Sequence, residues 1–78
     1  MAIRRLPPLR ALEAFVRTVR MGSARAAADE LGLSPSALSR RIGNLETFVG
    51  KKLFTRARQS MQLTDEGQAF YEAVNPHL

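Results

Sequence analysis

Apolar residues recur at helical spacing from the start of the chain, and residues that begin or end helices bound the first such stretch. An α-helix turns by about 100° per residue, and at this spacing the residues between Pro8 and Gly22 fall into an apolar side and a charged side. The apolar side carries Leu9, Leu12, Phe15, Val16 and Val19, and the other side carries Arg10, Glu13, Arg17 and Arg20. The pattern predicts a helix that begins near Pro8, ends at Gly22 and buries its apolar side.

Two shorter helices are predicted to follow. Ser23 is a favourable N-cap for an alanine-rich helix that reaches Leu31, and Gly32 can close this helix in the left-handed conformation. Ser34 and Pro35 then supply a cap and a first-turn proline for the next helix. Two helices joined in this way form either a structural hairpin or a helix-turn-helix, whose second helix enters the major groove of DNA.

The third predicted helix, about residues 35–48, has a narrow apolar seam and a small polar outer side. The seam consists of Leu38 together with Ile42, Leu45 and Val49, each of which lies within about 40° of Leu38 around the helix axis. The opposite side carries Ser36, Arg40, Gly43, Asn44 and Thr47, with Ser39 and Arg41 on its flanks. Such a surface lets a helix sink into a groove and bring hydroxyls and a guanidinium to base edges or phosphates. For this helix taken alone, an ordinary solvent-facing side is the alternative interpretation.

Beyond Gly50 the pattern predicts a hairpin, or wing, over residues 53–64. Two strands of about four residues, 53–56 and 61–64, flank a short turn at 57–60. The tip carries Arg56 and Arg58, which could reach phosphates or the narrow minor groove beside the helix. Arg56 could instead form an ion pair with Glu46, and the sequence leaves both interpretations open.

Thr64 is expected to cap a last helix, with Asp65 and Glu66 in the first turn, where acids favour the positive end of the helix dipole. Small and apolar residues form a stripe along this helix: Gly67, Phe70, Ala73 and Val74. The stripe is more apolar than a solvent-facing side should be. One interpretation is that Phe70 and Tyr71 pack back onto the first helix.

The charge distribution adds a polyanion as a candidate partner. The 78 residues suit one small domain, and 12 Lys and Arg against 7 Asp and Glu give a net charge of +5. Residues 1–58 carry all twelve cations and four acids, a net charge of +8, whereas residues 59–78 carry three acids and no cation. Ten of the cations are arginine, whose planar fork matches phosphates and guanine edges. A polyanion-binding surface should therefore lie before Gln59.

The amino-acid composition argues against an enzyme. Cysteine is absent and the single histidine is His77, which removes disulfides, thiolate metal sites and histidine-based catalytic groups. The sequence also has no glycine-rich phosphate loop and no acidic metal cluster. We therefore expect no catalytic residues, no metal and no cofactor in this domain. The apolar runs are far shorter than the ~20 residues that span a bilayer, so we expect a cytoplasmic protein without a membrane partner.

The order and spacing of many residues carry a family resemblance. They are Gly22-Ser23, Ala27-Ala28, Leu31-Gly32, Leu33-Ser34, Ser36 to Arg40, Ile42, Leu45-Glu46, Gly50, Leu53-Phe54, Arg56 and Leu63 to Gly67. From about residue 8 to 74, this pattern closely resembles the N-terminal DNA-binding domain of LysR-type transcriptional regulators. Relatives often have glutamine where Pro35 and Arg41 stand, so we expect a different base preference here.

The resemblance implies a mainly α fold, a winged helix-turn-helix with a three-helix core, a short two-stranded wing and a C-terminal linker helix used for dimerisation. Residues 1–64 would form the DNA-binding domain and residues 65–78 the start of the linker helix. An effector-sensing domain absent from this chain, with a small-molecule effector, would follow. The implied function is sequence-specific binding of double-stranded promoter DNA by a bacterial transcriptional regulator, as a dimer on a dyad site. The full-length protein could also be a tetramer, and RNA polymerase is a further partner that the resemblance allows.

We assign candidate site residues on this basis. Base-reading residues are Pro35, Ser36, Ser39 and Arg40. Contacts to the DNA backbone or flank are Ser23, Ser34, Arg41, Asn44, Lys52, Arg56 and Arg58. The dimer interface is Gly67, Phe70, Ala73 and Val74. The alternative function is a helical protein-interaction module without sequence-specific DNA readout, in which the arginines only increase solubility.

Overall fold

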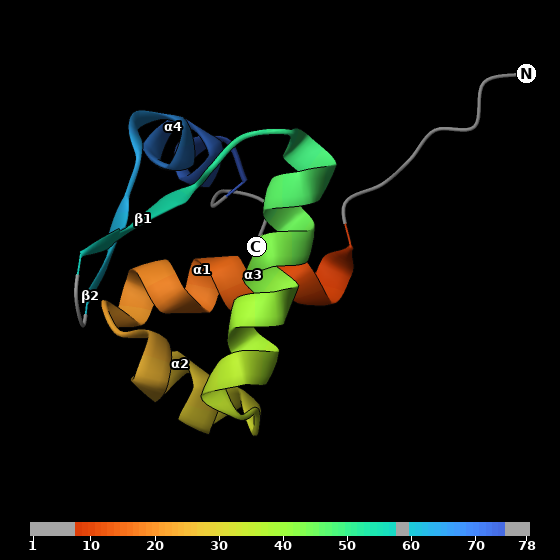
Figure 1. Ribbon diagram of the computed structural model, residues 1–78, viewed down its shortest axis with the longest axis vertical. Coiled ribbons are helices and arrows are strands. Elements are labelled where there is room, and N and C mark those ends of the chain that lie inside the picture. The colour runs from red at the N-terminus through yellow and green to blue at the C-terminus, as the bar shows by residue number, and fades with distance from the viewer. Residues whose placement is uncertain (1–7, 58–59, 75–78) are drawn as a thin grey trace, which may run out of the picture.

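The computed structural model describes residues 8–57 and 60–74, and in this part of the chain four helices and one hairpin follow one another (Figure 1). They are α1 (Leu9–Met21), α2 (Ala24–Leu31), α3 (Pro35–Val49), β1 (Phe54–Ala57), β2 (Ser60–Leu63) and α4 (Asp65–Val74). Figure 1 shows α3 crossing α1, with α2 beside the N-terminal end of α3 and the wing running from the other end. The predicted mainly α fold with a three-helix core and a short wing is confirmed.

Local capping accounts for the helix boundaries. The N–H of Ala26 donates to Ser23 Oγ and the N–H of Ala37 donates to Ser34 Oγ, both at 3.1 Å, so each serine satisfies an otherwise unpaired helix donor. Gly32 ends α2 with a φ of 69°, a conformation that side chains disfavour, and the next N–H, that of Leu33, bonds back to Ala28. The predicted caps are confirmed, and the turn directs the chain straight into α3.

The core lies where α1, α3 and the start of the wing meet. Phe15, Leu38, Leu45 and Leu53 are the largest fully buried side chains. Phe15 of α1 has ring neighbours from two other elements: its centroid lies 5.5 Å from that of Phe54 and 5.4 Å from that of Phe70, both edge-on. The predicted packing of the last helix onto the first is thus confirmed.

The burial of Leu9 differs from the sequence expectation. Its side chain is 72% exposed although it was assigned to the apolar side of α1. Leu9 is the first residue of the helix, and the core begins only at Ala11, so the periodic pattern extends one turn beyond what the rest of the domain covers.

The strands of the wing are shifted by one residue from their predicted positions. Phe54 pairs with Leu63 and Ala57 with Ser60 in an antiparallel register, so Leu53 and Thr64 lie just outside the strands. Leu53 is instead buried in the core, and the N–H of Thr64 donates to its carbonyl at 3.0 Å. Thr64 serves as the N-cap of α4, because its hydroxyl accepts from the N–H of Gly67 at 2.9 Å.

The junction between wing and α4 also explains the Leu-Thr-x-x-Gly motif. The Thr64 hydroxyl donates to the Lys52 carbonyl at 2.6 Å, which ties the end of the wing to its beginning. A Cβ at Gly67 would overlap the Leu53 carbonyl and press against the Leu63 side chain. Only glycine lets α4 approach the wing this closely, and the motif therefore builds the joint between the two.

Candidate nucleic-acid interface

The outer side of α3 is an exposed polar face built on a buried seam. Leu38, Ile42 and Leu45 are buried, which turns the opposite side of the helix to the surface. On that side Pro35, Ser36, Arg40, Asn44 and Thr47 are exposed, and Ser39, Arg41 and Gly43 are partly buried. The structure thus brings the four predicted base-reading residues together on the N-terminal half of one helix face, where a helix-turn-helix reads DNA.

A shallow groove, here named the basic groove, runs along the C-terminal half of this face. It is lined by Arg40, Gly43, Asn44, Glu46, Thr47, Gly50, Lys51 and Lys52. Three cations face one acid there, which suits a polyanion. Lys51 is not among the DNA-contact residues predicted from the sequence. Its position between the helix-ending Gly50 and Lys52 could have indicated it.

A second groove lies between α3 and the wing. It is lined by Ser39, Ile42, Gly43, Glu46, Lys52, Phe54 and Thr55. Gly43, Glu46 and Lys52 line both grooves, so the two grooves adjoin where the face of α3 meets the base of the wing. The wing therefore stands directly beside the predicted recognition helix.

Glu46 fixes this arrangement. Its Oε2 atom accepts hydrogen bonds from the N–H groups of Leu53 at 2.9 Å and Phe54 at 3.2 Å, and its Oε1 lies 3.9 Å from Lys52 Nζ. The carboxylate therefore holds the first residues of the wing against the last turns of α3. Sequence reasoning had considered Glu46 only as an ion-pair partner of Arg56 and had missed this role.

We expect Glu46→Leu to lower the free energy of unfolding by about 2 kcal/mol, because hydrogen bonds to a charged group contribute roughly 1.5–3 kcal/mol and two partly buried N–H donors would lose their acceptor. Glu46→Gln keeps an acceptor oxygen and should lose about half as much. Urea denaturation measures both. Lys52→Ala is the control, since its ion pair is 83% exposed on the lysine side and such pairs contribute ~0–1 kcal/mol. Equal stability of Glu46→Leu and the wild type would refute the anchoring role.

Of the other residues predicted to contact the DNA backbone or flank, two are helix caps and two lie wholly or partly outside the described residues. Ser23 and Ser34 both act as helix caps, and Ser34 Oγ also lies 3.3 Å from Ser36 Oγ. Their capping role accounts for both serines without DNA contact. Arg58 and the side chain of Arg56 lie outside the described residues, so the two interpretations of Arg56 stay open.

The predicted dimer stripe on α4 does not form one exposed face. Gly67 is buried against Leu53, the Phe70 ring packs on Phe15, and Val74 is half-buried against the core. Contacts distant in sequence turn Gly67 and part of Phe70 and Val74 inward, and the dimer interface itself stays a prediction. Ala73 is exposed, as is Ala69 one turn before it.

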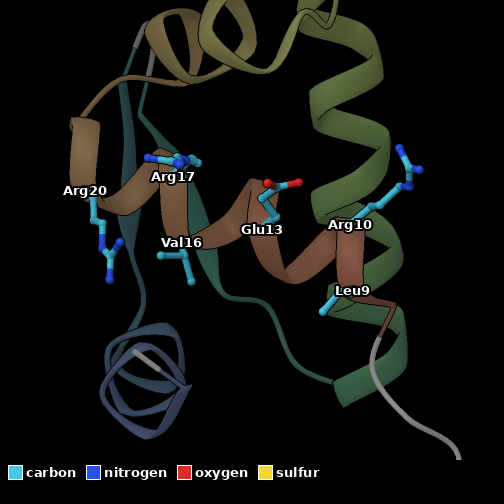
Figure 2. A pocket seen from close by; sticks show the side chains of 6 residues that line it. All are labelled: Leu9, Arg10, Glu13, Val16, Arg17 and Arg20. Atoms are coloured by element: carbon cyan, nitrogen blue, oxygen red, sulfur yellow. The ribbon is translucent and has the colours of Figure 1, made fainter. Parts of the chain in front are cut away.

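A further groove follows α1, away from the face of α3. Figure 2 shows the six side chains that line it: Leu9, Arg10, Glu13, Val16, Arg17 and Arg20. Val16 is buried, and Arg17 pairs with Glu30 of α2 at 3.3 Å, an ion pair that joins the two helices. This groove also has three cations and one acid, but it lacks the small polar side chains of the α3 face.

Fold and surface together define a class of protein. A helix-turn-helix whose second helix exposes small polar residues and arginine, flanked by a two-stranded wing and a basic groove, is a winged helix-turn-helix DNA-binding domain. Among the described residues, no helix has the length and hydrophobicity of a membrane-spanning helix, and no cluster of His, Cys, Asp or Glu could hold a metal ion.

Comparison with known proteins identifies the family. Residues 9–68 match the family model of bacterial regulatory helix-turn-helix proteins of the lysR family. Because this match covers most of the chain, the protein belongs to the LysR family, and the chain contains the family's DNA-binding domain.

Curated relatives include the glycine cleavage system transcriptional activator of Escherichia coli K12, which is 46% identical over 68 residues covering 87% of this chain and 22% of the relative. The HTH-type transcriptional activator BauR of Pseudomonas aeruginosa is 45% identical over 70 residues, covering 90% of this chain and 23% of the relative. The chain thus spans less than a quarter of the length of these relatives.

Solved structures agree. The DNA-binding domain of BenM in complex with benA site 1 DNA superimposes with a TM-score of 0.81 at 37% identity, covering 90% of this chain and 81% of that one. The CbnR DNA-binding domain in its DNA complex gives a TM-score of 0.82 at 30% identity, covering 90% of this chain and 80% of that one.

Proposed function

We propose that this domain binds double-stranded promoter DNA sequence-specifically, with α3 in the major groove and the wing beside it, as part of a bacterial transcriptional regulator. The observation that supports this most is the exposed outer side of α3. Ser36 and Arg40 are exposed there, while Leu38 on the opposite side of the helix is buried in the core. Small side chains around an arginine suit close entry into the groove and contact with guanine edges.

Two copies should bind one DNA site. A helix-turn-helix dimer reads half-sites one helical turn or a multiple of it apart, so we propose a dyad operator. We propose that α4 makes the twofold contact, where Ala73 and its neighbour Ala69 are exposed and Phe70 and Val74 are half-buried. A small-molecule effector would act on the remainder of the parent protein, which we place in the cytoplasm with the chromosome. We also propose that the full-length protein can form a tetramer and can contact RNA polymerase.

Selection of bound sequences from a random duplex pool tests the function. We expect an enriched inverted repeat with half-sites separated by one or more helical turns. A pool without enrichment would favour the alternative, a helical protein-interaction module. Complete loss of the domain's DNA binding in moderate salt and in the presence of non-specific duplex DNA would also favour this alternative.

With the selected site in hand, we expect Arg40→Ala to remove discrimination. Loss of a bidentate base contact costs ~1–3 kcal/mol per half-site, or about 5- to 150-fold in the affinity ratio between selected and scrambled DNA. Fluorescence anisotropy titrations of both duplexes measure this ratio. Lys52→Ala is the matched cation control and should weaken binding to both duplexes about equally, as a phosphate contact does. An unchanged ratio for Arg40→Ala would remove it from the base-reading residues.

A further inference from the structure

Gly43 stands in the interior of α3, where glycine is the least favourable residue after proline. Nothing in the described part of the domain requires it there. A Cβ built at Gly43 meets no atom within 4 Å, and its backbone is not in the left-handed conformation that favours glycine. Alanine would therefore fit and strengthen the helix. The reason for the missing side chain therefore lies outside the described part of the domain.

The surroundings of Gly43 indicate what that partner is. Gly43 lines both the basic groove and the groove beside the wing, and it lies one turn from Arg40 and one turn from Thr47 on the outer face. Lys51 and Lys52 border the same groove and are exposed. The glycine is thus a low point between cations that approach from both ends.

The position along the helix favours the DNA backbone over the bases. Gly43 follows Pro35 by eight residues, which at 1.5 Å per residue places it about 12 Å along the axis. The N-terminal residues of a recognition helix contact the base edges, and the major groove is about 12 Å wide between its two phosphate strands. If the first turn of α3 reaches the bases, as in helix-turn-helix proteins, Gly43 lies near the rim of the groove, where the phosphates are.

We infer that Gly43 is the point where a DNA sugar–phosphate strand comes closest to α3. The missing side chain lets the strand enter the basic groove, so that Arg40 or the Lys51-Lys52 pair can reach its phosphates. Gly43 is a positioning residue in this inference, which rests on the proposed DNA-binding function. Its contribution is sequence-independent, because it concerns the backbone of the DNA.

Gly43→Ala and Gly43→Leu test the inference. We expect Gly43→Ala to raise the melting temperature and yet to weaken binding to selected and scrambled duplexes alike. Removal of one phosphate interaction reduces the salt slope by about 0.9, which corresponds to roughly eightfold in affinity at 0.1 M salt. Gly43→Leu should weaken binding further. Gln68→Ala, an uncharged exposed change on α4, is the control and should bind both duplexes as the wild type does.

Each outcome has a distinct meaning. Failure of the wild-type domain to bind duplex DNA would overturn the proposed function itself. Wild-type binding with equally tight binding of Gly43→Ala and Gly43→Leu would overturn only the role of Gly43. A loss confined to the selected duplex, with an unchanged salt slope, would place Gly43 against a base edge and would also overturn the inference. Thermal melts followed by circular dichroism ensure that only folded variants are compared.

Discussion

Phe15→Ala should lower the free energy of unfolding by about 3–5 kcal/mol, the range for truncating a large buried aromatic side chain. Phe15 is fully buried, and its ring lies edge-on to rings from the wing and from α4: Phe54, Phe70 and Tyr71. Edge-to-face pairs add about 0.5–1.5 kcal/mol beyond the buried area. The substitution therefore weakens the attachment of both the wing and α4 to α1.

For a chain of this size the loss is large. A stability of ~0.05–0.15 kcal/mol per residue gives the whole domain roughly 4–12 kcal/mol. Urea denaturation of Phe15→Ala should thus show a folded state that is marginal at room temperature. Leu9→Ala is the control on the same helix, because Leu9 is exposed and should change stability by no more than about 0.5 kcal/mol. Similar losses for both variants would contradict the central position of Phe15.

The second large effect is expected for Gly67→Ala. Helix propensity alone predicts that alanine stabilises an interior helix position by up to about 1 kcal/mol. At Gly67, however, the added Cβ would overlap the Leu53 carbonyl, and a backbone group cannot rotate away as a flexible side chain can. Overpacking of this kind costs about 1–3 kcal/mol or more, so we expect destabilisation of about 3 kcal/mol.

Whether the melting temperature rises or falls decides between these two expectations. Gly43→Ala makes the same substitution inside another helix where the Cβ meets nothing within 4 Å, and it should raise the melting temperature. Gly67→Ala should lower it by roughly 12–24 °C, since 1 kcal/mol corresponds to about 4–8 °C in a domain of this size. An increase for both variants would show that α4 can move away from the wing without cost.

The sequence was most informative where structure is decided locally. Ser23 and Ser34 cap α2 and α3 as predicted, and Gly22 and Gly32 end helices in the left-handed conformation. Each of these features depends on a few neighbouring residues, so its signal is present in a short window. The outer face of α3 was predictable for the same reason, because the periodicity of Leu38, Ile42 and Leu45 fixes the opposite side.

Features that depend on distant residues were not predictable in this way. Leu53 reads as the first residue of a strand, but the Glu46 carboxylate binds its N–H from the preceding helix and the strand begins one residue later. Gly67 reads as part of an exposed small-residue stripe, whereas Leu53 and Leu63 cover it. In both cases the helical or alternating pattern is correct, and a contact across several elements decides what faces inward.

The base of the wing is closed without help from its tip. Glu46 holds the entry to β1, and Thr64 joins the exit of β2 to the Lys52 carbonyl. These hydrogen bonds join the two strands at the end where they meet α3 and α4, and doubling the length of a loop that connects two strands costs only about 0.6 kcal/mol. A change in the length of that connection should therefore leave α3 in its place beside the base of the wing.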